Sequence, residues 1–256
     1  MKIAVSGKGG VGKSTFAAAM ALLAARKGRR VLAVDADPDA NLAACLGIAV
    51  EKRKQIVPIS HQTKLIEERT GAKVKEYGQI FRLNPEVSDI ADKHAFVHEG
   101  VALLVLGAVQ RGGSGCACPE NVLIRALVTD LVLKRDEVLI MDMEAGIEHL
   151  GRGTARGVDC MVIVVEPGQR SVDCATRVIG MAKEIQIRRT KILANKVNTE
   201  EDEEFIRSAF PDEELLGVIP YSEGLRLSDK LGQSVLDGMN EDLLKRFEGV
   251  LAKLDR

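Results

Sequence analysis

Aromatic side chains are scarce in this sequence. Phe, Tyr and Trp together make up 3% of its 256 residues, and tryptophan is absent. Single-strand nucleic-acid-binding proteins commonly stack bases on aromatic side chains, so this composition argues against that class. An excess of one charge is also missing, because 36 Lys and Arg residues balance 37 Asp and Glu residues, for a formal net charge of −1. No overall field attracts a polyanion, and we expect no nucleic-acid partner.

Long apolar runs are missing as well. No stretch approaches the ~18 uninterrupted apolar residues of a membrane-spanning helix. The sequence begins MKIAVSGKGG, whose apolar part has the length of a strand and not of a signal peptide. The last residues, EDLLKRFEGVLAKLDR, are amphipathic with mixed charge, which is typical of a packed terminal helix. The five cysteines form an odd count without a disulfide framework. We therefore expect a cytoplasmic protein with no membrane partner.

Aliphatic residues are abundant, and they alternate in a regular way. Short Val/Ile/Leu-rich runs of strand length are separated by segments with helical periodicity. This alternation predicts one α/β domain over residues 1–256, with a doubly wound, mostly parallel sheet of about seven or eight strands and helices on both faces. The predicted strands are 2–6, 31–35, 101–106, 137–142, 159–166, 191–194 and 215–219. The predicted helices are 13–27, 120–133, 171–184, 201–209 and 241–253.

One region does not follow the alternation. Residues at about 50–100 are polar, weakly periodic and longer than an ordinary connection. We interpret them as an insertion between the second and third predicted strands. His94 and His98 in this region are four residues apart and would share one face of a helix, and a surface helix is the expected arrangement. No acidic general base lies between them, which excludes a metalloprotease motif but leaves an auxiliary metal site open.

The stretch GKGGVGKST matches the P-loop pattern G-x-x-x-x-G-K-[ST]. A predicted strand precedes it and a run of good helix formers follows it, which is the context the motif requires. Backbone N–H groups of the loop and of the helix N-terminus are expected to bind the phosphates of ATP or ADP. Lys13 would reach the β- and γ-phosphates, and the Ser14 hydroxyl would bind Mg²⁺. The predicted nucleotide-binding residues here are Gly9, Gly10, Val11, Gly12, Lys13, Ser14 and Thr15.

A second lysine, Lys8, follows the first glycine of the loop. The stretch KGGVGKS resembles the deviant Walker A motif of the MinD, ParA and nitrogenase-iron-protein class of dimerising ATPases. The resemblance implies a homodimer in which Lys8 reaches the nucleotide of the partner subunit. Lys8 would then be a catalytic residue beside Lys13 and would stabilise charge in trans, as an arginine finger does. The alternative is an exposed loop lysine.

Two further stretches match the switches of this class. VLAVDADPDANL places Asp35 and Asp37 at the end of the second predicted strand. The resemblance implies that Asp37 positions the attacking water as a catalytic residue and that Asp35 contributes to the Mg²⁺ site. VLIMDMEAG ends a buried strand with Asp142, which matches a Walker B aspartate that binds Mg²⁺. Residues 144–146 would form the second switch. We expect Asp39 and Asn41 only to cap the next helix.

Two late stretches match the adenine side of the class. ILANKVN places Asn195 at the end of a predicted strand, where its side-chain amide would contact the adenine edge. GVIPYSE resembles the adenine-side loop and adds Pro220, with Tyr221 as a weaker candidate.

Cys116 and Cys118 lie one residue apart in GGSGCACPEN. Together with MDMEAGIEHLGRGTARGVD and VEPGQRS, this stretch resembles the CooC-type nickel-insertion ATPases, which are accessory proteins of carbon monoxide dehydrogenase with relatives that serve acetyl-CoA synthase. The likeness extends from residue 1 to about residue 235. It implies that the cysteine pairs of two subunits meet across the dimer axis and bind Ni²⁺ or Zn²⁺, and that a nickel enzyme is the client.

The chemistry of the pair is consistent with that resemblance. A two-fold axis turns two thiolates into four, which suits a tetrahedral metal site. Pro119 and Glu120 are expected to open a helix, whose N-terminus would lower the pKa of the thiols. The alternative is a pair of inert loop residues. Cys45, Cys160 and Cys174 fall in apolar patterns and are expected to be structural. His149, just after the second switch, is expected to make a structural hydrogen bond.

Two other functions are known for ATPases with this loop. A MinD- or ParA-like positioning ATPase would need a basic amphipathic tail or a surface lysine cluster for membrane or DNA, and the mixed-charge tail argues against it. An iron–sulfur electron-transfer ATPase has cluster ligands that are well separated in sequence, unlike Cys116 and Cys118. The prediction is a slow, dimerisation-coupled ATPase that delivers nickel.

Overall fold

The computed structural model describes residues 1–74, 76, 79–107, 118–134, 136–144, 150 and 152–255. In this part of the chain, eight strands form one sheet in the order β3-β4-β2-β5-β1-β6-β7-β8. Neighbours are parallel except for β3 and β4, which are antiparallel. The strands are β1 (Lys2–Ser6), β2 (Val31–Ala36), β3 (Phe96–His98), β4 (Val101–Val105), β5 (Val138–Met143), β6 (Cys160–Val165), β7 (Thr190–Val197) and β8 (Leu215–Pro220).

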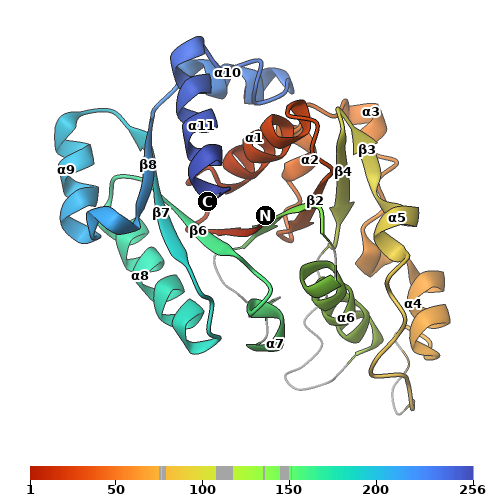
Figure 1. Ribbon diagram of the computed structural model, residues 1–256. Coiled ribbons are helices and arrows are strands. Elements are labelled where there is room, and N and C mark those ends of the chain that lie inside the picture. The colour runs from red at the N-terminus through yellow and green to blue at the C-terminus, as the bar shows by residue number, and fades with distance from the viewer. Residues whose placement is uncertain are drawn as a thin grey trace.

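Helices cover both faces of this sheet (Figure 1). One face carries α1 (Lys13–Arg26), α2 (Leu42–Cys45), α3 (Val50–Arg53), α10 (Glu223–Leu231) and α11 (Glu241–Leu254). The other face carries α4 (Thr63–Thr70), α5 (Ile90–His94), α6 (Pro119–Lys134), α7 (Arg152–Ala155), α8 (Gln169–Glu184) and α9 (Glu200–Ala209). Two short 3₁₀ helices, η1 (Ile59–His61) and η2 (Asp212–Glu214), complete the described elements. The doubly wound, mostly parallel α/β fold predicted from the sequence is confirmed.

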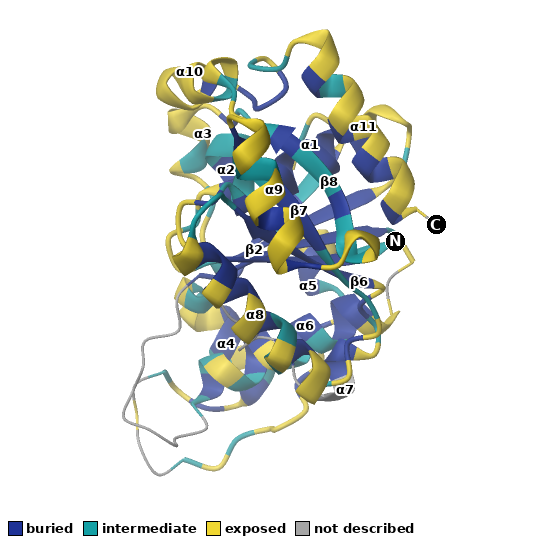
Figure 2. Cartoon of the chain, turned by 90° about the vertical axis from the view of Figure 1, so that its left-hand side faces the viewer, coloured by how far each residue is buried: buried dark blue, intermediate teal, exposed yellow. Residues whose placement is uncertain are grey.

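The apolar strand runs exist because the central strands are buried on both faces. All six positions of β2, β5 and β6 are buried. Successive residues alternate between the two cores, so that Ile3 and Val5 of β1 pack on the α1 face and Ala4 packs on the α6 face. Figure 2 shows this arrangement as a buried interior between helices whose outer surfaces are exposed. Covering both faces of a parallel sheet in this way requires near-continuous hydrophobic strands.

The α1 helix is the most deeply buried of the described helices. Every residue from Phe16 to Ala24 is buried, and most of them are alanines. Small side chains let the helix lie close to the sheet, while the ring of Phe16 packs against Phe247 of α11 at a centroid distance of 6.4 Å. The helix that follows the glycine-rich loop is therefore fixed on both sides.

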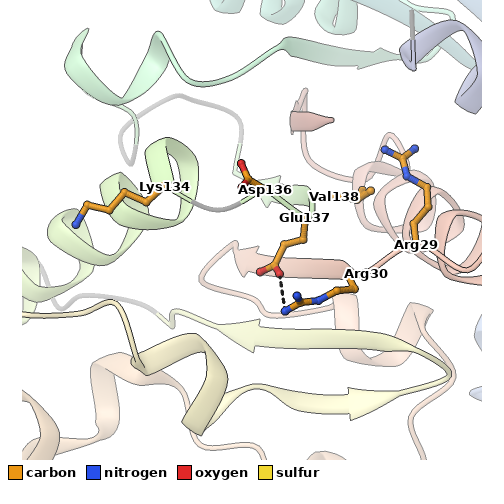
Figure 3. A pocket seen from close by; sticks show the side chains of 6 residues that line it. All are labelled: Arg29, Arg30, Lys134, Asp136, Glu137 and Val138. Atoms are coloured by element: carbon orange, nitrogen blue, oxygen red, sulfur yellow. Dashed lines mark ion pairs between the residues drawn. The ribbon is translucent and has the colours of Figure 1, made fainter.

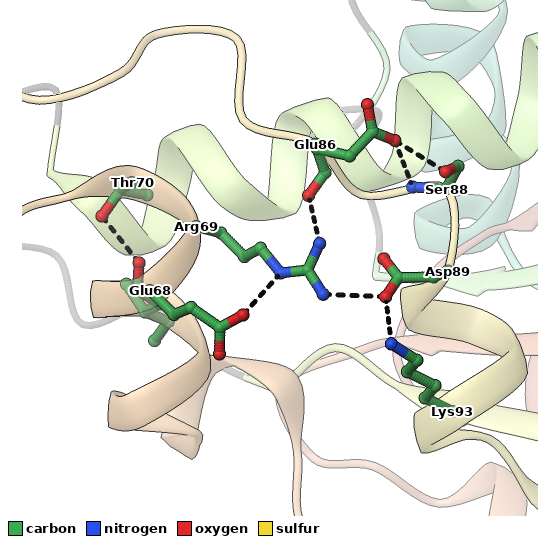
Figure 4. A network of polar contacts seen from close by, with 8 residues as sticks. Glu68, Arg69, Thr70, Glu86, Ser88, Asp89 and Lys93 are labelled. Carbon is green, nitrogen blue, oxygen red and sulfur yellow. Dashed lines mark hydrogen bonds and ion pairs between the residues drawn. The ribbon is translucent and has the colours of Figure 1, made fainter.

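The insertion at 50–100 is built from α3, η1, α4, α5 and β3. Its side chains Ile66 and Ile90 belong to the same hydrophobic cluster as α6. Several polar residues of the insertion form a hydrogen-bond network around Arg69 (Figure 4). The Arg69 guanidinium donates to the Asp89 carboxylate at 2.8 Å and to the Glu86 carbonyl at 3.2 Å, and Lys93 lies 2.7 Å from the same carboxylate. These contacts connect α4 to the start of α5 and keep the pKa of Asp89 well below its ordinary value.

The predicted helix across His94 and His98 is wrong. The α5 helix ends at His94, and His98 lies on β3, so the two imidazoles do not share a helix face. The cause is the connection Glu99–Gly100, where both residues have positive φ, at 45° and 79°. Two consecutive positive φ values are typical of a two-residue hairpin turn, and they pair His98 with Val101 in an antiparallel edge.

The α10 helix was also not predicted. Ser222 caps it by accepting a hydrogen bond from the Leu225 N–H at 3.2 Å, and Gly232 ends it with a φ of 66°. Both capping residues are visible in the sequence, but the helix is short and its buried residue is Ser228, so no apolar run marks it. In the described residues, no helix is long and apolar enough to cross a membrane.

Candidate nucleotide site

The glycines of the P-loop are required by the geometry at two positions. A Cβ on Gly7 would lie 2.4 Å from the Val164 carbonyl oxygen, and a Cβ on Gly12 would lie 2.4 Å from Asn195 Nδ2. Gly12 also has a φ of 98°, which other residues rarely adopt. Gly9, in contrast, has open space where a Cβ would be. The two glycines fixed in the sequence pattern are therefore the two whose side chains would collide with neighbouring strands.

The N-terminus of α1 is suited to bind phosphate. Gly12 occupies the cap position, no side chain caps the first turn, and no acidic residue lies in it. The first N–H groups of a helix lack intrahelical partners and attract anions. Lys13 begins the helix with a side chain that is only 7% exposed, and its ammonium lies 3.9 Å from Asp37 Oδ2. The lysine thus reaches from the loop toward the end of β2.

Asp35 lies at the buried end of β2, and each of its carboxylate oxygens has a backbone donor. Its carboxylate accepts hydrogen bonds from the Asp37 N–H at 3.2 Å and from the Leu42 N–H at 2.9 Å. Burial, with a contribution from Asp142, raises the pKa of Asp35 to about 7. Asn41 stands at the cap position of α2 without a capping side-chain bond, so the predicted capping by Asn41 is wrong. Asp35 supplies that contact to the first turn of α2 instead.

Asp142 on β5 is next to Asp35 in the sheet register. Both of its carboxylate oxygens are buried and have no hydrogen-bond partner of ordinary geometry in the described part of the chain. Burial raises its pKa to about 6, while the nearby Ser14 hydroxyl and the Lys13 ammonium oppose the rise. Buried polar atoms are normally paired, and oxygen donors are the ligands that Mg²⁺ uses. The Asp142 and Ser14 oxygens therefore fit a magnesium site beside the phosphate loop.

The end of β7 contacts the phosphate loop directly. The Asn195 side-chain Nδ2 donates to the Val11 carbonyl at 2.7 Å, and Lys196 Nζ donates to the Gly10 carbonyl at 2.6 Å. The register between β7 and β8 shifts between Ala194 and Val197, and Lys196 has a φ of 59°. This irregularity brings two successive side chains to the loop. An adenine contact by Asn195 stays a prediction, as does one by Pro220, which ends β8 opposite Val197.

Lys8 is engaged within its own chain. Its ammonium lies 3.0 Å from Glu166 Oε1, and Lys196 Nζ lies 3.6 Å from Glu166 Oε2. Glu166 follows β6, the strand between β1 and β7. The sequence interpretation missed Glu166 and Lys196. The available signal was a charged residue directly after a buried strand, at the same edge of the sheet as the P-loop.

The predicted thiol pair is described only in part. Cys116, residues 145–146 and His149 lie outside the described residues. Cys118 is half-buried directly before α6. The expected lowering of its pKa is wrong, because burial raises the pKa of this thiol, Glu120 adds to the rise, and the Asn121 backbone N–H opposes it. Among the described residues, no three His, Cys, Asp or Glu side chains gather as a metal site. The metal role of the pair stays a prediction.

The remaining cysteines behave as the sequence suggested, with one difference. Cys160 and Cys174 are buried, whereas Cys45 is half-buried. Burial raises the pKa of Cys45 to about 12, with Asp142 adding to the rise and a hydrogen bond with Thr15 opposing it. The Cys45 thiol is therefore protonated and unreactive at neutral pH.

A hollow lies at the opposite end of the strands from the P-loop and does not compete as a phosphate site (Figure 3). Its lining includes three cations, but each has a carboxylate partner. Arg30 pairs with Glu137 at 3.4 Å, and Arg29 pairs with Asp255. Lys134 pairs with Asp130 at 2.8 Å. The hollow lies at the amino ends of β2 and β5, whereas ligands of doubly wound sheets bind at the carboxyl ends.

Comparisons with known proteins agree with this geometry. Residues 2–235 match the model of the CobQ/CobB/MinD/ParA nucleotide binding domain. The carbon monoxide dehydrogenase accessory protein CooC of Rhodospirillum rubrum is 46% identical over 237 residues, which is 93% of this chain and 90% of the relative. An uncharacterized ATP-binding protein of Methanocaldococcus jannaschii is 42% identical over 99% of this chain and 98% of its own length.

A solved structure supports the fold independently of sequence. A ParA family ATPase from Chlorobium tepidum TLS superposes with a TM-score of 0.69 at 21% identity, over 100% of this chain and 98% of that chain. The phosphate loop, the buried Asp142 and these matches point to the same class. The chain belongs to the CobQ/CobB/MinD/ParA nucleotide-binding family and is a P-loop ATPase of the CooC type.

Proposed function

We propose that the chain is a dimerising metallochaperone ATPase that binds a metal through Cys116 and Cys118 of two subunits and assists nickel insertion into carbon monoxide dehydrogenase or acetyl-CoA synthase. The observation that carries the proposal is the connection between the nucleotide site and the cysteines. β4 ends beside Asp35, and the chain then runs through the two cysteines into α6. The likeness to a carbon monoxide dehydrogenase accessory protein over 93% of the chain supports the class of client.

The nucleotide would bind along the P-loop. The N–H groups of residues 9–15 would donate to the phosphates, and Lys13 would leave Asp37, 3.9 Å away, for the β- and γ-phosphates. Ser14, Asp142 and Asp35 would hold the magnesium ion, which neutralises phosphate charge when bound. Moving Lys13 away frees an oxygen of Asp37 to accept a hydrogen bond from the attacking water. Asp37 would act by orienting that water.

The first switch has a direct backbone path toward the cysteines. The Leu106 N–H donates to the Asp35 carbonyl at 2.9 Å, and the Ser60 N–H donates to the Leu106 carbonyl at 2.9 Å. Gly107 follows with a φ of 79°, and a Cβ there would lie 2.6 Å from Pro58 Cβ. A movement of β2 that accompanies nucleotide exchange would therefore be passed to the segment that begins at Gly107.

The dimer supplies the remaining parts of the mechanism. Lys8 would contact the nucleotide of the partner subunit, so ATP binding and dimerisation would favour each other. The two cysteine pairs would then meet at the axis and complete a four-sulfur site for the nickel ion, which is cargo and not a resident cofactor. Hydrolysis would reset the dimer. We expect slow turnover without the client enzyme.

The proposal is tested by replacing both cysteines. The variant Cys116→Ala/Cys118→Ala should lose stoichiometric Ni²⁺ or Zn²⁺, measured by elemental analysis of the purified protein, and should bind a fluorescent ATP analogue as the parent does. Cys174→Ala is the matched control, because this buried thiol lies outside the proposed site. If the double variant retains the metal of the parent, the assignment of the metal site is wrong.

A further inference from the structure

Three charged side chains meet beside the P-loop, and we call them the Lys8–Glu166–Lys196 cluster. They follow or end three adjacent strands, β1, β6 and β7, with the carboxylate on the middle one. One oxygen of Glu166 lies 3.0 Å from the Lys8 ammonium, and the other lies 3.6 Å from that of Lys196. The side chains are 40%, 25% and 42% exposed in the order of the name. The carboxylate is the least exposed member and is shared by two cations.

Glu166 is fixed in place by its own backbone. Its N–H donates to the Ser171 hydroxyl at 3.1 Å, and Ser171 is 2% exposed in the first turn of α8. Pro167 follows and restricts the backbone of Glu166 to extended conformations. The carboxylate is thus held at the carboxyl edge of the sheet, within reach of the P-loop.

Lys196 is held there at a cost in backbone strain. Its φ of 59° is unfavourable for a residue with a side chain, and the irregular register of β7 against β8 accompanies it. The same ammonium donates to the Gly10 carbonyl at 2.6 Å. Lys196 therefore contacts both the P-loop and Glu166. Among the described contacts, the Lys8 ammonium donates to Glu166 and to no carbonyl of the loop.

Lys8 can consequently leave Glu166 more easily than Lys196 can. If Lys8 leaves, Glu166 keeps Lys196 as a counter-ion, and no unpaired charge remains. We propose that Glu166 is a positioning residue that holds Lys8 in cis in the monomer and releases it to the nucleotide of a partner subunit, while Lys196 neutralises the carboxylate that Lys8 leaves. This inference rests on the proposed role of Lys8 in trans.

The strength of the contact sets the expected effect. Ion pairs between partly exposed side chains are weak, and their typical range corresponds to about a two- to fivefold change in an equilibrium constant. The triphosphate of ATP carries more negative charge than one carboxylate, so it can replace Glu166 as the partner of Lys8. Glu166 would therefore shift the dimerisation equilibrium moderately and would not block it.

The test measures dimerisation with a non-hydrolysable ATP analogue, by sedimentation velocity over a series of protein concentrations. Glu166→Gln should lower the dimer dissociation constant about two- to fivefold. Glu203→Gln is the matched control, because it removes an exposed carboxylate that pairs with Arg207 at 2.7 Å on α9, away from the P-loop, and it should leave the constant unchanged. Glu166→Asp keeps the charge and should return the constant toward that of the parent.

A double-mutant cycle separates this inference from the proposed function. Lys8→Gln should weaken nucleotide-dependent dimerisation, and Glu166→Gln should have no further effect in that background. If Lys8→Gln weakens the dimer but Glu166→Gln alone does not tighten it, or only lowers the melting temperature, the positioning role is overturned and the proposed function stands. If Lys8→Gln leaves dimerisation unchanged, the role of Lys8 in trans fails and the inference fails with it.

Discussion

Asp142 illustrates how a single residue can be poor for stability and suited to function. Its carboxylate oxygens are buried without hydrogen-bond partners of ordinary geometry in the described part of the chain. An unpartnered buried polar group costs about 1–3 kcal/mol. The raised pKa of Asp142, caused mainly by burial, reflects the same cost of burying charge. Sites that bind ligands often retain such unfavourable groups.

We predict that Asp142→Asn makes the nucleotide-free protein more stable and the enzyme inactive. Removing the buried charge should raise the free energy of unfolding by about 1–2 kcal/mol, as measured by urea denaturation in the presence of a chelator. Magnesium-dependent ATP hydrolysis should be lost, because the amide is a poor ligand for Mg²⁺. Asp173→Asn on the exposed side of α8 is the control and should change neither quantity. A destabilised Asp142→Asn variant would contradict the prediction.

At the same scale, the sequence reveals residues that belong to a motif but not their partners. Gly7, Gly12 and Lys13 are fixed by a local pattern, and in the structure the two glycines lie between β1 and Lys13, the first residue of α1. Glu166 and Lys196 are not fixed by such a pattern, because their contacts depend on β1, β6 and β7 lying side by side. The sequence does not show this strand order, and only the three-dimensional structure does.

At the scale of elements, the insertion is held together by polar contacts as well as by apolar ones. Arg69 of α4 and Lys93 of α5 both contact Asp89, which precedes α5 (Figure 4). The hydrogen bond from Arg69 is the main reason why the pKa of Asp89 is lowered, and the one from Lys93 is the next. The carboxylate therefore stabilises the insertion in its ionised form.

The lowered pKa predicts a pH-dependent contribution to stability. Because the pKa of Asp89 is lower in the folded protein than in the unfolded chain, its contribution is present above about pH 4, the ordinary Asp value, and is lost as pH falls through the folded pKa. Asp89→Asn should lower the melting temperature by a few degrees at pH 7, and the difference from the parent should shrink below about pH 4.

The matched control for this prediction is Glu76→Gln. Among the contacts of the described residues, the Glu76 carboxylate forms an exposed pair with Lys73 at 3.7 Å, so its replacement should leave the melting temperature nearly unchanged at every pH. Circular dichroism melts at pH 7, 5 and 3 measure both variants. A difference between Asp89→Asn and the parent that does not vary with pH would show that the carboxylate is not stabilising through its charge.

Elements with long apolar runs were predicted from the sequence, and short elements that bury little surface were not. The strands β2 and β5 are buried on both faces, which makes their apolar runs distinctive. In contrast, β3 has three residues at the edge of the sheet, and its pairing depends on the turn at Glu99–Gly100. A spacing of four between His94 and His98 cannot distinguish a helix from a helix end followed by a strand.

At the scale of the whole molecule, the fold places the nucleotide site and the start of the cysteine-containing segment next to each other. Two hydrogen bonds, from the Leu106 amide to the Asp35 carbonyl and from the Ser60 amide to the Leu106 carbonyl, connect the end of β2 through Leu106 to the insertion. The insertion therefore supports the point at which the chain leaves β4, which gives it a place in the proposed coupling. The overall class was predictable because strand and helix alternate, but this chain of contacts was not, since it joins segments far apart in the sequence.

We predict that nucleotide and metal affinities are coupled, as the proposed function requires. The non-hydrolysable ATP analogue should change the affinity for Ni²⁺ or Zn²⁺ about tenfold, and the metal should change the affinity for the analogue by the same factor. Competition with a metal chelator gives the first quantity, and calorimetric titration with the analogue gives the second. In the Cys116→Ala/Cys118→Ala variant the analogue should bind with the affinity of the metal-free parent.

Gly107→Ala tests the path of this coupling. Its Cβ would lie 2.4 Å from Ser60 Oγ and 2.6 Å from Pro58 Cβ, so the contact between the end of β4 and the insertion must change. Gly107→Ala should therefore keep both ligands but reduce the coupling factor. Gly28→Ala, where φ is 75° and a Cβ has no neighbour within 4 Å, controls for the loss of a glycine with positive φ and should retain the coupling. Equal coupling in Gly107→Ala and the parent would exclude this contact as the connection between the two sites.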